Sequence, residues 1–119
     1  MVMISTATYK KIDPDHRAVF SPTVIQGMLR GDLKYRGVVI SDDVGAAAQV
    51  ASVPAGQRAT RFVAAGGDIV ITAKASLTAT MVDALVDKAQ QDKAFEALLK
   101  SSVRRVLALK QRRDLVSCG

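Results

Sequence analysis

Three short, uninterrupted apolar runs, each followed by a polar loop and an amphipathic stretch, most constrain how this chain can fold. The runs are Val2-Met3-Ile4, Gly37-Val38-Val39-Ile40 and Asp68-Ile69-Val70-Ile71. Continuous rather than alternating apolar character is typical of parallel strands buried on both faces. The strand starts are separated by 36 and 31 residues, the length of a βα unit. The sequence therefore predicts an α/β chain of order β-α-β-α-β-α-α, with parallel strands and right-handed crossovers.

The ends of the predicted helices carry recognisable signals. Ser21-Pro22 can cap and begin the first helix, and Gly31 can stop it. The other helices are predicted over 57–65, 78–90 and 92–112, and Gly66-Gly67 terminates the first of these three. The last of them is expected to bury a stripe made of Phe95, Leu98, Leu99, Val103, Val106 and Leu107.

Length and composition indicate one globular unit. The chain has 119 residues, of which 49% are hydrophobic and 24% charged. No apolar run approaches the roughly 20 residues of a membrane span, and no signal-peptide pattern opens the chain. Cys118 stands alone near the end, which excludes an internal disulfide and a cysteine metal cluster. Because the first strand begins at residue 2, we expect residues 1–119 to be a single partial domain, truncated from a larger one.

The excess of positive charge lies in one segment. The net charge is +6, and most of it falls between Lys100 and Asp114. Cations favour the C-terminal end of a helix, and no aromatic residue is interleaved there to stack on bases. We therefore expect a solvated helix end and no nucleic-acid partner.

Candidate chemistry gathers after the second strand, at Ser41-Asp42-Asp43. The carboxyl end of a buried parallel strand is where α/β folds place their ligands. Alternation along the strand predicts that Asp42 and Asp43 point in different directions, one toward a pocket and the other toward the following loop. The simpler interpretation, in which one Asp caps a helix and the other is solvated, stays open on spacing alone.

Consecutive segments of the chain, in order, resemble glycoside hydrolase family 3. The matching segments are Val2-Met3-Ile4-Ser5, Ile12-Asp13-Pro14, Phe20-Ser21-Pro22 with Val24-Ile25, Leu29-Arg30, Gly37 to Asp43, Ala64 to Asp68, and Ser102 to Leu107 with Lys110. The resemblance covers nearly the whole chain. It implies that these residues are the last three βα units of a (β/α)8 barrel.

The resemblance implies a retaining hydrolysis with Asp42 as the nucleophile, which forms a glycosyl-enzyme ester that water releases. A second acid after the nucleophile, Asp43, is similar to the β-N-acetylhexosaminidase branch, whereas β-glucosidases usually have Trp there. The implied substrate is a glycoside of β-linked N-acetylglucosamine. Asp43 and Ser41 would shape the substrate site. Asp13 and Arg17, on the loop after the first strand, would lie on the same C-terminal rim of the barrel and help to bind substrate. No cofactor or metal is implied.

Some of the branch's features differ here. Its general acid is a His paired with an Asp on a loop earlier in the barrel, and residues 1–119 do not include that segment. His16 does not match that motif and is expected to be solvated. Thr6 stands where the branch commonly has His, and Val44-Gly45-Ala46 where it usually has Leu and Met. We therefore expect these residues alone to hydrolyse glycosides poorly or not at all.

Two other interpretations remain open. One is a phosphoacceptor receiver domain, with Lys74 after the third strand, although no acid follows the first strand. The other is a non-catalytic remnant that binds sugar or supports assembly. A partial barrel would leave both sheet edges open, which favours a homo-oligomer or association with the missing remainder. The sequence indicates no compartment.

Overall fold

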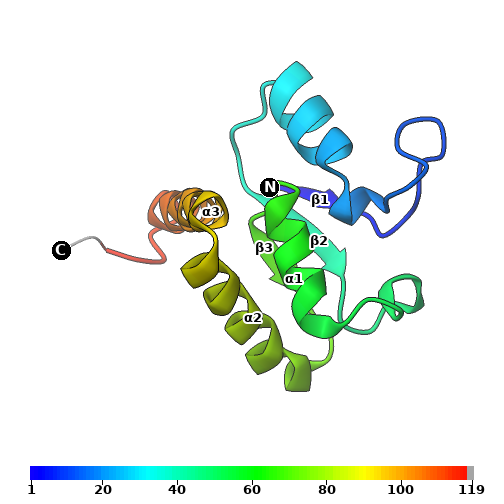
Figure 1. Ribbon diagram of the computed structural model, residues 1–119. Helices are drawn as coiled ribbons and strands as arrows, with labels where there is room; N and C mark the ends of the chain where they lie inside the picture. The colour runs from blue at the N-terminus through cyan, green and yellow to red at the C-terminus, as the bar shows by residue number, and fades with distance from the viewer. Residues whose placement is uncertain (118–119) are drawn as a thin grey trace.

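The computed structural model describes residues 1–117, and it confirms the α/β class (Figure 1). A single parallel sheet consists of β1 (Val2–Ile4), β2 (Val39–Asp43) and β3 (Ile69–Ile71), in the order β1-β2-β3. Val2 pairs with Val39 and Ile40 pairs with Ile69, and the register shifts between Ile40 and Asp43. The strands thus lie side by side in chain order. A receiver domain would instead place its first strand between its second and third.

Helical segments follow each strand, close to the predicted ranges. After β1 come a short 3-10 helix, η1 (Ala18–Phe20), and the π-helix η2 (Thr23–Asp32), which continues one residue past Gly31, the predicted stop. After β2 come η3 (Ala48–Val50) and α1 (Ala55–Ala64). After β3 come η4 (Ala75–Leu77), α2 (Thr78–Gln91) and the long α3 (Lys93–Gln111).

Side-chain caps explain where two of these helices begin. The Ser21 hydroxyl accepts the backbone N–H of Val24 at 3.1 Å, so the predicted cap precedes η2. Asp92 accepts the N–H groups of Ala94 and Phe95, both at 3.0 Å, at the start of α3. Each cap satisfies donors that a helix cannot satisfy within itself.

The core lies on one side of the sheet. Ile4 and Val39 point there and pack in one cluster with Ile25 of η2 and Phe62 of α1. Alternation then turns Met3, Ile40 and Asp42 toward the other side, where Met3 is 60% exposed and the other two are half-buried. One face of the sheet is therefore packed, and the other is uncovered by any part of residues 1–117.

The predicted apolar stripe of α3 is only partly buried, which corrects the expectation. Phe95 is buried, but Val103 and Leu107 are each 49% exposed. At the opposite edge, Leu33 beyond η2 is 73% exposed. The exposed side of α3 and the surface around Leu33 lie at opposite edges of the three-strand sheet. No further βα unit of the described chain packs against either of them.

A buried carboxylate that the sequence did not single out joins the first and last units. Asp68, whose side chain is fully buried, accepts from Arg30 of η2 at 2.8 Å and from Arg105 of α3 at 2.8 and 2.9 Å. It also accepts the backbone N–H of Val39 at 2.8 Å. One carboxylate thereby ties η2, β2 and α3 together.

The basic segment is largely solvated, as expected for its helix-end position. Arg104, Lys110, Arg112 and Arg113 are exposed. Lys100 pairs with Glu96 at 2.7 Å, while Arg105 is the exception that turns inward to Asp68. Cys118 lies outside the described residues. Within those residues, no helix is long and apolar enough to cross a bilayer.

Candidate functional site

Asp42 lies near the C-terminal end of the central strand, on the uncovered face of the sheet. Its carboxylate is half-buried, and its Oδ1 accepts the backbone N–H of Asp43 at 2.8 Å. No other described residue donates to it within hydrogen-bonding distance. A carboxylate with open lone pairs on a solvent-accessible sheet face can act on a ligand that approaches from that side.

Asp43 is engaged by the protein itself. Its Oδ1 accepts the backbone N–H groups of Gly45 at 2.8 Å, Ala46 at 3.1 Å and Ala73 at 3.1 Å. The Ala73 hydrogen bond is the main reason that the pKa of Asp43 lies below its ordinary value, and Lys74 adds to the effect. Asp43 thus joins the loop after β2 to the loop after β3. The two carboxylates point apart, in agreement with the alternation argument.

Ser41 faces the packed side and is fully buried. Its hydroxyl accepts the backbone N–H of Ile71 at 2.9 Å, at the point where the β2–β3 register shifts. It therefore supports the neighbouring strand beneath Asp42 and does not reach the uncovered face.

Asp13 is the centre of a compact loop after β1. It accepts the Ser21 hydroxyl at 2.6 Å, and its Oδ1 lies 3.0 Å from Nδ1 of His16. The Ser21 hydrogen bond is the largest influence that lowers the pKa of Asp13, and His16 reinforces it. Asp13 is a buried loop anchor, and its pairing with His16 was not expected from the sequence.

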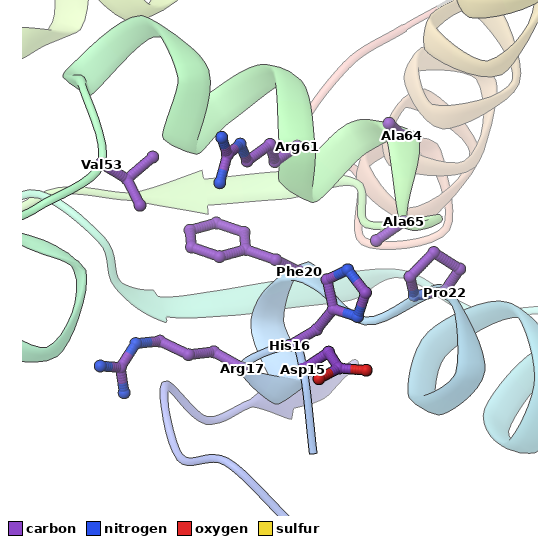
Figure 2. Close-up of a pocket in the computed structure, with 9 residues that line it drawn as sticks. All are labelled: Asp15, His16, Arg17, Phe20, Pro22, Val53, Arg61, Ala64 and Ala65. Carbon is purple, nitrogen blue, oxygen red and sulfur yellow. The ribbon is translucent and has the colours of Figure 1, made fainter. Parts of the chain in front are cut away.

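Arg17 and His16 line a cavity of about 540 Å³ (Figure 2). Arg17 donates from Nη1 to the backbone carbonyl of Thr6 at 3.2 Å. Neither Asp42 nor Asp43 is among the residues that line this cavity. The structure thus places Arg17 and Asp42 on the same edge of the sheet but does not bring them to one pocket.

Arg58 of α1 is a second residue that sequence reasoning missed. It is 8% exposed and donates to four backbone carbonyls of the loop that follows Asp43. Nε reaches Val53 at 2.6 Å, Nη1 reaches Val44 at 2.9 Å and Gly45 at 3.0 Å, and Nη2 reaches Ala51 at 3.3 Å. The planar guanidinium, with five donors in fixed directions, suits this arrangement better than an ammonium group.

Replacing Arg58 with Met should lower the free energy of unfolding by about 2–3 kcal/mol, because buried carbonyls lose charged donors. Urea unfolding followed by circular dichroism measures the change. The matched control is Arg61→Met on the same helix, where the exposed side chain predicts a change within about 0.5 kcal/mol. Equal effects for the two variants would contradict the role of Arg58.

Arg58 and Asp68 carried some signal in the sequence. Asp68 stands at the entrance to a buried strand, a position where an ionised side chain needs a partner. The sequence signal for Arg58 was weaker, because its carbonyl partners depend on the path of the loop. Among residues 1–117, no group of three or more His, Cys, Asp or Glu side chains is arranged to hold a metal ion.

Residues 1–109 match the family model described as the glycosyl hydrolase family 3 N terminal domain. A β-hexosaminidase from Stenotrophomonas maltophilia (strain R551-3) is 34% identical over 98 residues, which are 82% of this chain and 29% of that protein.

Solved structures agree with this match. The chain is similar to a β-N-acetylhexosaminidase from Beutenbergia cavernae, with 46% identity and a TM-score of 0.90 over 92% of this chain and 33% of that one. It is also similar to a family 3 β-N-acetylglucosaminidase from Paenibacillus, with 32% identity and a TM-score of 0.85 over 98% of this chain and 23% of that one. The chain spans a third or less of the length of these relatives. On the strength of the family match over most of its length, the chain belongs to glycoside hydrolase family 3.

Proposed function

We propose that this chain forms part of a retaining β-N-acetylhexosaminidase in which Asp42 is the nucleophile. The observation that supports this is the placement of Asp42, half-buried near the C-terminal end of β2, on the sheet face that no helix within residues 1–117 covers. In a (β/α)8 barrel that face is the interior, and the C-terminal ends of its strands carry the active site. The three units in chain order fit the last three of such a barrel.

In this proposal the carboxylate of Asp42 attacks the anomeric carbon of a terminal β-linked N-acetylglucosamine. The C–O bond to the leaving group breaks as the ester to Asp42 forms, and water then hydrolyses that ester with overall retention. Asp43 and Ser41 support Asp42 through the backbone around it, and their roles toward the substrate are indirect. Asp13 anchors the loop after β1 that carries Asp15, His16 and Arg17, called the rim loop below.

The general acid in this scheme belongs to another part of the barrel. His16 does pair with Asp13, yet its ring lines a cavity that does not include Asp42. We therefore propose that residues 1–119 are a partial domain whose exposed apolar edges are covered by the rest of the barrel or by a second copy. A non-catalytic remnant is the competing possibility, and the next experiment separates the two.

In the Beutenbergia cavernae protein, the matching segment should be replaced by residues 1–109 of this chain. The chimera is expected to hydrolyse an aryl N-acetyl-β-glucosaminide. The chain alone should be slower by about 10²–10⁴ or more, because it lacks general acid catalysis and the other pocket walls. A folded but inactive chimera, beside an active parent protein, would favour the remnant.

A further inference from the structure

The cavity beside η1 is formed entirely within this chain. Its walls come from the rim loop (Asp15, His16, Arg17), from Phe20 and Pro22, from Val53, and from α1 (Figure 2). It lies between the first and second βα units, so neither open edge of the sheet contributes to it. Its volume of about 540 Å³ is that of a small-molecule site.

Two guanidinium groups in its wall have no carboxylate partner among residues 1–117. Arg17 donates to the carbonyl of Thr6, and Arg61 donates from Nη2 to Oε1 of Gln57 at 3.0 Å. Each guanidinium has five N–H donors, so most of them remain available. In Figure 2 Arg61 on α1 lies beside the Phe20 ring, and Arg17 on the rim loop lies on the other side of the ring and extends away from it. Uncompensated cations on two walls of one cavity attract an anion.

The His16 ring adds a directed acceptor. Asp13 is anchored by Ser21 and lies 3.0 Å from Nδ1 of His16, so the carboxylate favours a proton on Nδ1. Nε2 is then the ring nitrogen left to form a hydrogen bond with a hydroxyl group of a ligand. Phe20, Val53 and Pro22 supply apolar surface between these polar groups.

We propose that this cavity binds a small ligand that carries an oxyanion, a carboxylate or a phosphate, on a hydroxylated body with an apolar face. The two guanidinium groups attract the oxyanion from opposite walls, a hydroxyl group forms a hydrogen bond with Nε2 of His16, and the apolar face lies against Phe20. The site is additional to the one proposed around Asp42, because none of residues 41–43 lines it.

Asp15 is the one carboxylate in the cavity wall, and it opposes the anion. This gives the proposal a test with opposite signs. Removing the charge of Arg17 or Arg61 should weaken binding, whereas removing the charge of Asp15 should strengthen it. These side chains are exposed or half-exposed, so the substitutions leave the core intact.

The chain should be titrated by calorimetry and by NMR with glucuronate, glucose 6-phosphate and glucose. At least one of the two anionic sugars is expected to bind and to shift the ring signals of Phe20 and His16, and the better of the two identifies carboxylate or phosphate as the preferred group. R17Q and R61Q should each weaken binding roughly tenfold, the typical contribution of a charge-assisted hydrogen bond. D15N should tighten it. Glucose should bind at least roughly tenfold more weakly than the better anion.

The matched control is R104Q, which removes an exposed charge from α3, outside the cavity. It should leave the affinity within about twofold, the scale of a screened surface charge. Absence of binding by both anions, equal binding of glucose, or equal weakening by R104Q and R61Q would each overturn the proposal. None of these outcomes bears on hydrolysis at Asp42, which is measured separately in the chimera.

Discussion

Asp42→Asn in the chimera should lower kcat for an aryl N-acetyl-β-glucosaminide by roughly 10⁴- to 10⁶-fold, the range observed when one member of a covalent catalytic group is removed. The carboxamide is neutral and cannot form the glycosyl ester. Shape and volume are nearly conserved, and the single described hydrogen bond, from the N–H of Asp43 to Oδ1, can be kept by the amide oxygen. The fold should therefore be unaffected, so the loss reports chemistry.

Asp43→Asn is the matched control, because it changes the neighbouring carboxylate in the same way. Its oxygen can still accept from Gly45, Ala46 and Ala73, so we expect a much smaller loss of kcat. A fluorinated aryl glycoside that accumulates the ester should add its mass to the peptide that contains Asp42, and Asp42→Asn should prevent this. Labelling of another carboxylate, or full activity of the Asp42 variant, would show that the assignment is wrong.

Asp68→Ala should lower the free energy of unfolding of the chain by about 3–5 kcal/mol, the usual cost of breaking a buried ion pair from one side. The substitution leaves Arg30 and Arg105 without their carboxylate, and the N–H of Val39 without its acceptor. For a chain of this size the melting temperature should fall by roughly 10–20 °C. Differential scanning calorimetry measures the shift.

The control for Asp68 is Asp92→Ala, which removes the N-cap of α3 and should lower the free energy of unfolding by about 1 kcal/mol. A smaller effect for Asp68→Ala than for Asp92→Ala would contradict the structural role of the buried carboxylate. Arg105→Met should fall between them, since Asp68 then keeps Arg30 and the N–H of Val39.

The strands and helices could be predicted because their signals are local. Continuous β-branched runs and the Ser21 cap depend on neighbouring residues, and the structure confirms both. The opposite directions of Asp42 and Asp43 also follow from strand alternation. The exposure of Val103 and Leu107 could not be predicted, because a helical stripe shows which face is apolar and does not show whether a partner covers it.

The functional residues divide in the same way. Asp42 was predicted from its position after a buried strand together with the family resemblance, and its catalytic role remains a prediction. The contacts of Arg58 could not be predicted, since they join a helix to the main chain of a loop whose path no local pattern specifies. The pairing of His16 with Asp13 depends in the same way on the fold of the rim loop.

Buried Val44 and Val50 anchor the loop after Asp42 in the core, and the hydrogen bonds that hold it are made to its main chain. Asp43 accepts its N–H groups at one end, and Arg58 donates to its carbonyls along its length. Neither contact depends on which side chains the loop carries, apart from Gly45, where an added Cβ would collide with Thr72. Substitutions at exposed positions such as Ala46 and Gln49 can therefore accumulate in evolution without moving the carboxylate that precedes them. Selection can therefore change the surface that this loop presents to a ligand while leaving the carboxylate of Asp42 in place.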